Sequence, residues 1–142
     1  MGSHTSKIVS YKDAVIGLGD DEFCRFKEGF ERLCRVPGGF RQMDPTVFQR
    51  YVLSDFPEMV CLYVLIPLYV IHCVLQPPVL ASRMFKVIDV DKDGGISFEE
   101  FICGMYVLTR GSRAELLRFV FNVFDIDCTG KVSRSDLFKY CK

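Results

Sequence analysis

The sequence lacks an excess of charge of either sign. Eighteen Lys and Arg residues balance eighteen Asp and Glu residues, so the formal net charge at pH 7 is zero. A protein without net positive charge has no long-range attraction to phosphate backbones and gains little from counterion release. The composition therefore argues against nucleic-acid binding.

Histidine is scarce, and cysteine is not clustered. The chain has two histidines, and its seven cysteines form no C-x-x-C pair. Structural zinc sites need closely spaced Cys and His ligands, and disulfide-stapled secreted domains need an even, clustered set of cysteines. We therefore expect reduced cysteines that serve as small hydrophobic side chains in a cytoplasmic protein. No nucleophile and base have a spacing that suggests catalysis, so we expect no enzyme activity.

Hydrophobic residues are abundant. They make up 49% of the 142 residues, and thirteen are Phe, enough for the core of one ordinary domain. Phe23, Phe26 and Phe30 recur at helical spacing and predict a helix that begins near Asp20. The same spacing flanks two acidic stretches, so we expect helices on both sides of each.

The first acidic stretch, DVDKDGGISFEE, fits the twelve-residue loop that binds calcium between two helices. Calcium takes six to eight hard oxygen ligands, and alternate residues of this stretch place carboxylates at positions one, three and five. Gly94, at position six, allows the sharp turn around the ion. We call residues 89–100 the central loop; its predicted ligands are Asp89, Asp91, Asp93, Gly95 (through its carbonyl), Ser97 and Glu100.

A second stretch, DIDCTGKVSRSD, follows at residues 125–136, and we call it the C-terminal loop. Thr129 replaces a carboxylate there, and Asp136 is one methylene shorter than the usual Glu, so we expect weaker calcium binding or magnesium binding. Ile96 and Val132 occupy the apolar position eight of the two loops and are predicted to pair in a short strand. The predicted ligands of the C-terminal loop are Asp125, Asp127, Thr129, Lys131 (through its carbonyl), Ser133 and Asp136.

The stretch from Val79 to Lys142 resembles two consecutive EF-hands of the calmodulin superfamily. The phrase ISFEEFICGMYVLTRGSRAELLRFVFNVFDID is similar to calcineurin B, to calcineurin-B-like sensors and to the EF-hand region that opens some ubiquitin-specific proteases. The resemblance implies an all-α fold in which residues 79–142 form an EF-hand helix–loop–helix pair with a short two-stranded link between the loops.

The resemblance also places an earlier hand within residues 20–59. Its would-be loop, CRVPGGFRQMDP, has almost no acidic ligands, so we interpret it as a degenerate hand that has lost its ion. Sensors of the calcineurin B type have four hands, whereas this sequence stops after the third loop. Three hypotheses explain this difference: the chain is an isoform, a truncated product or a piece of a larger protein.

Residues 1–19 are expected to be flexible and begin with MGSHTS. This start fits the myristoylation pattern, in which Gly2 becomes acylated after removal of Met1. One acyl chain gives only reversible membrane attachment. An expression-tag remnant or a chance match is the alternative interpretation.

Residues 60–78 form an atypical apolar insertion. The run VCLYVLIPLYVIHCVL is shorter than the roughly 20 residues that span a bilayer and contains Pro67. A membrane helix, a buried or partner-facing helix and a translated intron are three open interpretations. The third arises because removing residues 60–76 restores the usual spacing between hands, and Val and Gln codons match intron borders.

These features together predict a calcium-binding protein that exposes Phe- and Met-lined surface to a target helix or catalytic subunit when calcium binds. A calcium buffer would bind without opening. The alternatives are a regulatory fragment of a larger enzyme, such as a ubiquitin-specific protease, and a membrane-anchored EF-hand protein. We also expect a cytoplasmic location. Reversible membrane association through the acylated N-terminus and a homodimer are further expectations.

Overall fold

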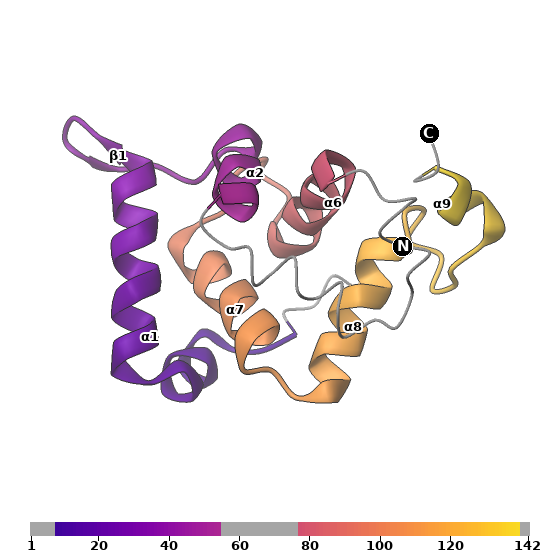
Figure 1. The fold of residues 1–142 in the computed structure, drawn as a ribbon, viewed down its shortest axis with the longest axis horizontal. Coiled ribbons are helices and arrows are strands. Elements are labelled where there is room, and N and C mark those ends of the chain that lie inside the picture. Colours follow the sequence, from indigo (N-terminus) through magenta and orange to yellow (C-terminus); the bar gives the residue numbers. More distant parts are fainter. Residues whose placement is uncertain (1–7, 55–76, 140–142) are drawn as a thin grey trace.

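The computed structural model describes residues 8–54 and 77–139. Within these ranges the chain is mainly helical, which confirms the predicted all-α fold, and one two-stranded antiparallel sheet is present. Among the described residues no helix is long and apolar enough to cross a membrane. The elements are α1 (Tyr11–Cys34), β1 (Arg35–Val36), β2 (Gly39–Phe40), α2 (Pro45–Ser54), α6 (Pro77–Ile88), α7 (Phe98–Thr109), α8 (Arg113–Phe124) and α9 (Arg134–Phe138) (Figure 1).

Helix α1 begins earlier than the sequence suggested. Ser10 caps it by accepting a hydrogen bond from the Asp13 N–H, so residues expected to be flexible are helical from Tyr11. Gly19, with φ 73° and ψ 169°, breaks the helix into a short first segment and a long second segment that begins where the predicted helix does (Figure 1). The first segment is ordered because Ala14 and Leu18 are buried in the core.

The described helices form three helix–loop–helix units. The N-terminal unit consists of α1 and α2, the central unit of α6 and α7 around the central loop, and the C-terminal unit of α8 and α9 around the C-terminal loop (Figure 1). Helix α6 begins at Pro77, two residues before the expected start, and proline suits the first turn of a helix. The apolar run of residues 60–75 lies outside the described residues.

A backbone bridge joins the N-terminal unit to the central unit. The Met43 N–H donates to the Ile96 carbonyl at 2.8 Å, and the Ile96 N–H donates back to the Met43 carbonyl at 2.9 Å. A link between two loops is therefore present, but it joins the central loop to the N-terminal unit, and the predicted pairing of Ile96 with Val132 was wrong. Met43 and Ile96 are 1% and 0% exposed, whereas Val132 is 38% exposed, so the observed pairing is the one that closes over the core.

Aromatic rings from three helices meet beside this bridge. Phe101 on α7 is fully buried, and its ring centroid lies 5.3 Å from that of Phe30 on α1 and 5.6 Å from that of Tyr51 on α2. Such contacts add to the hydrophobic gain from burial. Because Phe101 directly follows Glu100, the core fixes the last residue of the central loop.

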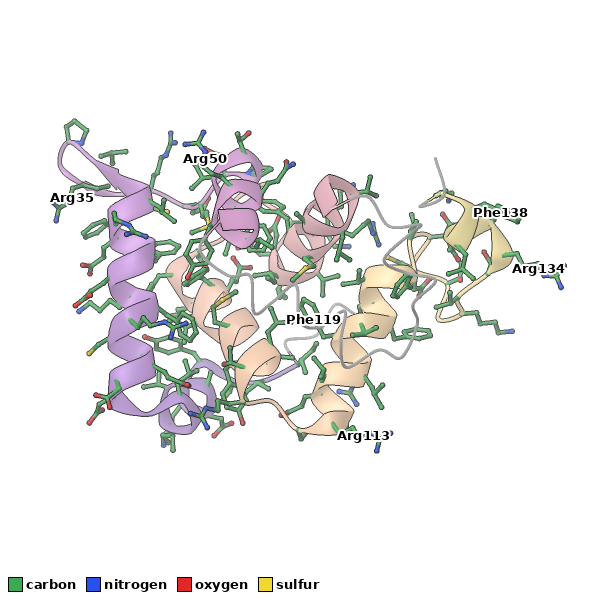
Figure 2. The ribbon with its side chains drawn as sticks, viewed as in Figure 1. Arg35, Arg50, Arg113, Phe119, Arg134 and Phe138 are labelled. Atoms are coloured by element: carbon green, nitrogen blue, oxygen red, sulfur yellow. The ribbon has the colours of Figure 1, made fainter. Side chains whose placement is uncertain are left out.

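The C-terminal unit lies against α6. Phe119 and Val123 bury one face of α8, and the Arg83 Nε on α6 donates to the Val123 carbonyl at 3.2 Å. Helix α9 extends to the far end of the molecule, where the labelled Phe138 side chain projects outward (Figure 2). This unit is therefore attached to α6 through α8 and through the first residue of its loop, because the Arg83 guanidinium also donates to the Asp125 carbonyl at 3.4 Å.

Phe101→Ala is expected to lower the free energy of unfolding by about 3–5 kcal/mol, because it removes a buried ring that contacts two other helices. Leu117→Ala, at a position 58% exposed on α8, is the matched control and should change stability by less than about 0.5 kcal/mol. Urea unfolding of both variants measures the difference. Equal losses would show that the core does not centre on Phe101.

Candidate metal centre

The central loop folds back on itself between α6 and α7. Lys92 and Gly94 have positive φ values of 59° and 90°, which produce the sharp turn that the sequence assigned to Gly94. The Gly94 N–H donates to the Asp89 carboxylate at 3.1 Å, and the Gly95 N–H donates to the Asp93 carboxylate at 3.0 Å. These bonds orient acidic side chains toward the inside of the turn.

Three of the predicted ligands meet inside this turn. Asp89, Asp91 and Asp93 each place one carboxylate oxygen within 4.8 Å of the others. Hard carboxylate oxygens at such spacing suit a divalent cation such as calcium. The acidic residues at positions one, three and five are thus close together in space, as the loop pattern predicts.

Asp89 provides the most specific sign of a cation site. Its side chain is 5% exposed, yet its Oδ1 has no hydrogen-bond partner. Burial raises the pKa of this carboxyl, and the neighbouring Asp91, Glu100 and Asp93 raise it further. A buried, unpaired carboxylate oxygen is costly in a protein interior, and a cation in the turn would compensate it.

Ser97 and Glu100 lie at the closing end of the loop, where Ser97 caps α7 and Glu100 belongs to its first turn. The Glu100 carboxylate accepts hydrogen bonds from the Val90 N–H at 2.8 Å and from the Ser97 N–H at 2.9 Å. In this structure Glu100 therefore ties the two ends of the loop together and stands outside the group of three aspartates. The same contacts make a capping box, which stabilises the start of α7.

Gln42 is a site residue that the sequence did not reveal. Its Nε2 donates to the Asp93 Oδ2 at 2.5 Å, although 51 residues separate them along the chain. This bond, followed by the Gly95 N–H, holds the pKa of Asp93 below its ordinary value. No local pattern marks Gln42, because it lies in a segment whose own loop lacks acidic ligands.

The C-terminal loop adopts a similar turn but has a different interior. Cys128 and Gly130 have positive φ values of 52° and 77°, at the same loop positions as Lys92 and Gly94. Both oxygens of the buried Asp125 accept backbone hydrogen bonds, so that carboxylate is fully paired in the protein alone.

Other predicted ligands of the C-terminal loop also have protein partners. The Lys139 Nζ donates to Asp127 at 2.8 Å, and the Thr129 hydroxyl donates to the Lys131 carbonyl at 3.1 Å. Asp136 is buried, and hydrogen bonds from the N–H and hydroxyl of Ser133 lower its pKa; its Oδ1 has no partner. In the part of the chain that the structure describes, the three-acid group occurs in the central loop alone.

The model of the EF hand domain family matches residues 81–108, which contain most of α6, the whole central loop and most of α7. This match confirms the predicted EF-hand at the central loop. No solved structure was found to match the chain.

Curated relatives extend the similarity to both sides of this hand. Calcium-binding protein NCSA of Dictyostelium discoideum is 41% identical over 58 residues, which are 41% of this chain and 31% of that protein. Calcineurin B of Candida glabrata is 43% identical over 60 residues, 42% of this chain and 34% of that protein. Visinin of Gallus gallus is 28% identical over 120 residues, 84% of this chain and 52% of that protein. The chain thus spans from about a third to about half the length of these relatives.

The unpaired oxygen of Asp89 leads to a prediction for the metal-free protein. Asp89→Asn should raise the free energy of unfolding by about 1 kcal/mol, because the amide can still accept from Gly94 while its NH₂ donates to Asp91 or Asp93. Asp125→Asn should instead destabilise the protein, since both Asp125 oxygens already accept N–H groups.

Urea unfolding in the presence of a chelator measures both variants. Opposite signs are the expected result. A loss of stability in both variants would contradict the assignment of the Asp89 oxygen as an uncompensated group.

Proposed function

We propose that this protein is a non-enzymatic calcium-binding regulatory module whose working site is the central loop. The observation that supports this most strongly is the buried, unpaired Asp89 oxygen beside two further carboxylates. The names of two relatives, a calcium-binding protein and a calcineurin subunit, agree with this function.

The residues proposed to hold calcium are those predicted from the loop pattern. Asp89, Asp91 and Asp93 supply carboxylates, and Glu100 supplies another at the closing position. The ion contributes positive charge, which offsets the repulsion between these carboxylates. The remaining ligands in the proposal are the Gly95 carbonyl and Ser97, the latter directly or through water.

Glu100 is proposed to convert calcium binding into movement of α7. Its carboxylate now bonds to N–H groups at both ends of the loop, and its neighbour Phe101 lies in the aromatic core. A calcium ion that takes the Glu100 carboxylate as a ligand would compete with those hydrogen bonds. The start of α7 would then move relative to α1. This coupling is what distinguishes a sensor from a buffer.

The C-terminal loop is proposed to bind more weakly, or to take magnesium. Asp127 is paired with Lys139, and the Lys131 carbonyl already accepts from Thr129. A cation has to replace these contacts before it gains ligands. Asp136 is also shorter than the Glu at the corresponding position of the central loop.

An apolar surface on the C-terminal unit is proposed to receive a protein partner. Five of the exposed large hydrophobic residues of the described chain belong to this unit: Leu117, Phe121, Val132, Leu137 and Phe138. Leu117 and Phe121 are four residues apart on α8 and therefore share a helix face, and exposed apolar side chains that share a face mark interaction sites. The partner in this proposal is an amphipathic helix or a catalytic subunit; a second copy of the chain would use the same surface.

Location and membrane contact follow from the same proposal. We place the protein in the cytoplasm, where calcium signals act on such modules. Acylation of Gly2, which lies outside the described residues, would add reversible membrane contact. The chain covers only part of the length of its relatives. The proposed role is the same if the chain is a regulatory piece of a larger protein.

A calorimetric calcium titration in the presence of magnesium tests the site. The wild type should bind calcium, and Glu100→Gln should weaken the first step at least about tenfold, since an amide replaces the closing carboxylate. Glu99→Gln, which changes the exposed adjacent residue, is the matched control and should retain wild-type affinity. No heat at millimolar calcium would overturn the proposed function.

The sensor role is tested by calcium-dependent exposure of apolar surface. Fluorescence of a dye that binds apolar patches should rise when calcium is added to the wild type and should stay unchanged in Glu100→Gln. Calcium binding in the titration without a rise in dye fluorescence would identify a buffer.

A further inference from the structure

The N-terminal unit contributes a side chain to the calcium site although its own loop has almost no acidic ligands. Gln42 directly precedes Met43, whose backbone is fixed by two hydrogen bonds to Ile96 in the central loop. Met43 and Ile96 are both buried, so the bridge cannot shift without opening the core. The position of Gln42 over the central loop is therefore set by backbone pairing.

Gln42 makes close contact with two consecutive odd positions of the central loop. Its Nε2 donates to the Asp93 Oδ2 at 2.5 Å. A Cβ placed on Gly95 would lie 2.6 Å from the Gln42 Oε1 and 2.8 Å from its Cβ, which shows how closely the side chain covers this residue. Asp93 and Gly95 are the residues at positions five and seven.

The bond from Gln42 completes the support of Asp93. The other oxygen, Oδ1, accepts from the Gly95 N–H at 3.0 Å, so hydrogen bonds hold both ends of the carboxylate. Asp93 is otherwise exposed to solvent, and an exposed aspartate without these bonds would sample several rotamers. Two donors on opposite oxygens fix the plane of the carboxylate before an ion arrives.

We propose that Gln42 is a positioning residue of the calcium site, through which the metal-free N-terminal unit pre-orients Asp93 and covers Gly95. The inference rests on the proposed function of the central loop. Residues that hold metal ligands in place contribute measurably to metal affinity even though they never touch the ion. The N-terminal unit then serves the site by this contact as well as by packing.

Gln42→Ala should weaken calcium binding by about threefold to tenfold, near the lower end of the range for such supporting contacts because Asp93 is exposed. Arg41→Ala is the matched control in the same segment. Arg41 is exposed and pairs with Asp44 at 3.0 Å, so its loss disturbs the segment without removing the bond to Asp93. We expect no weakening of calcium binding in Arg41→Ala.

Two further measurements separate positioning from a general structural effect. The metal-free Gln42→Ala protein should unfold within a few degrees of the wild type, because Gln42 is exposed. In an Asp93→Ala background, Gln42→Ala should cause little additional loss of calcium affinity, since the bond that it removes requires an acceptor oxygen on the side chain at position 93. An equal loss in both backgrounds would overturn the inference.

The outcomes also distinguish this inference from the function on which it rests. If the wild type binds calcium and Gln42→Ala binds it equally well, the positioning role is wrong and the calcium site stands. The same conclusion follows if Arg41→Ala loses as much affinity as Gln42→Ala. If the wild type binds no calcium, both the function and the positioning role are wrong.

Discussion

The backbone bridge between Met43 and Ile96 is the interaction on which the rest of the structure depends. It holds the loop of the N-terminal unit against the central loop, with one hydrogen bond in each direction, of 2.8 and 2.9 Å. Residues next to the bridge extend this link: Gln42, which precedes Met43, donates to Asp93, and Phe101, five residues after Ile96, packs against Phe30. A unit whose own loop has almost no acidic residues is therefore the structural partner of the proposed calcium site.

The carboxylates of the central loop are proposed metal ligands, and they also destabilise the protein when no metal is bound. These carboxylates repel one another, and Asp89 keeps a buried oxygen without a partner. Groups of this kind destabilise a metal-free protein and give a cation its binding energy, a familiar conflict between stability and function. In the C-terminal loop Asp125 satisfies both its oxygens with backbone N–H groups. Asp136, at the last position of the C-terminal loop, also keeps a buried oxygen without a partner. The two loops thus share a turn and differ in where the unpaired oxygen lies: at the first position of the central loop and at the last position of the C-terminal loop.

Local patterns predicted the central loop well, because its ligand spacing lies within twelve consecutive residues. They predicted that Ile96 pairs with Val132 in a short link between loops, because position eight is apolar in both loops. Ile96 pairs with Met43 instead, and the sequence does not show which loops meet. They missed the helix that begins at Tyr11, whose order depends on burial of Ala14 and Leu18 against distant helices. They also missed Gln42, because its role arises from a contact across 51 residues.

We propose that the N-terminal unit and the central loop act as one unit when calcium binds. Amide hydrogen exchange at Met43, Ile96 and Val132, with and without calcium, tests it most directly. Calcium should slow exchange at Met43 and Ile96 by the same factor, because one reciprocal bridge protects both amides. Slower exchange at Ile96 and Val132 with no change at Met43 would contradict it, since the central loop would then pair with the C-terminal loop.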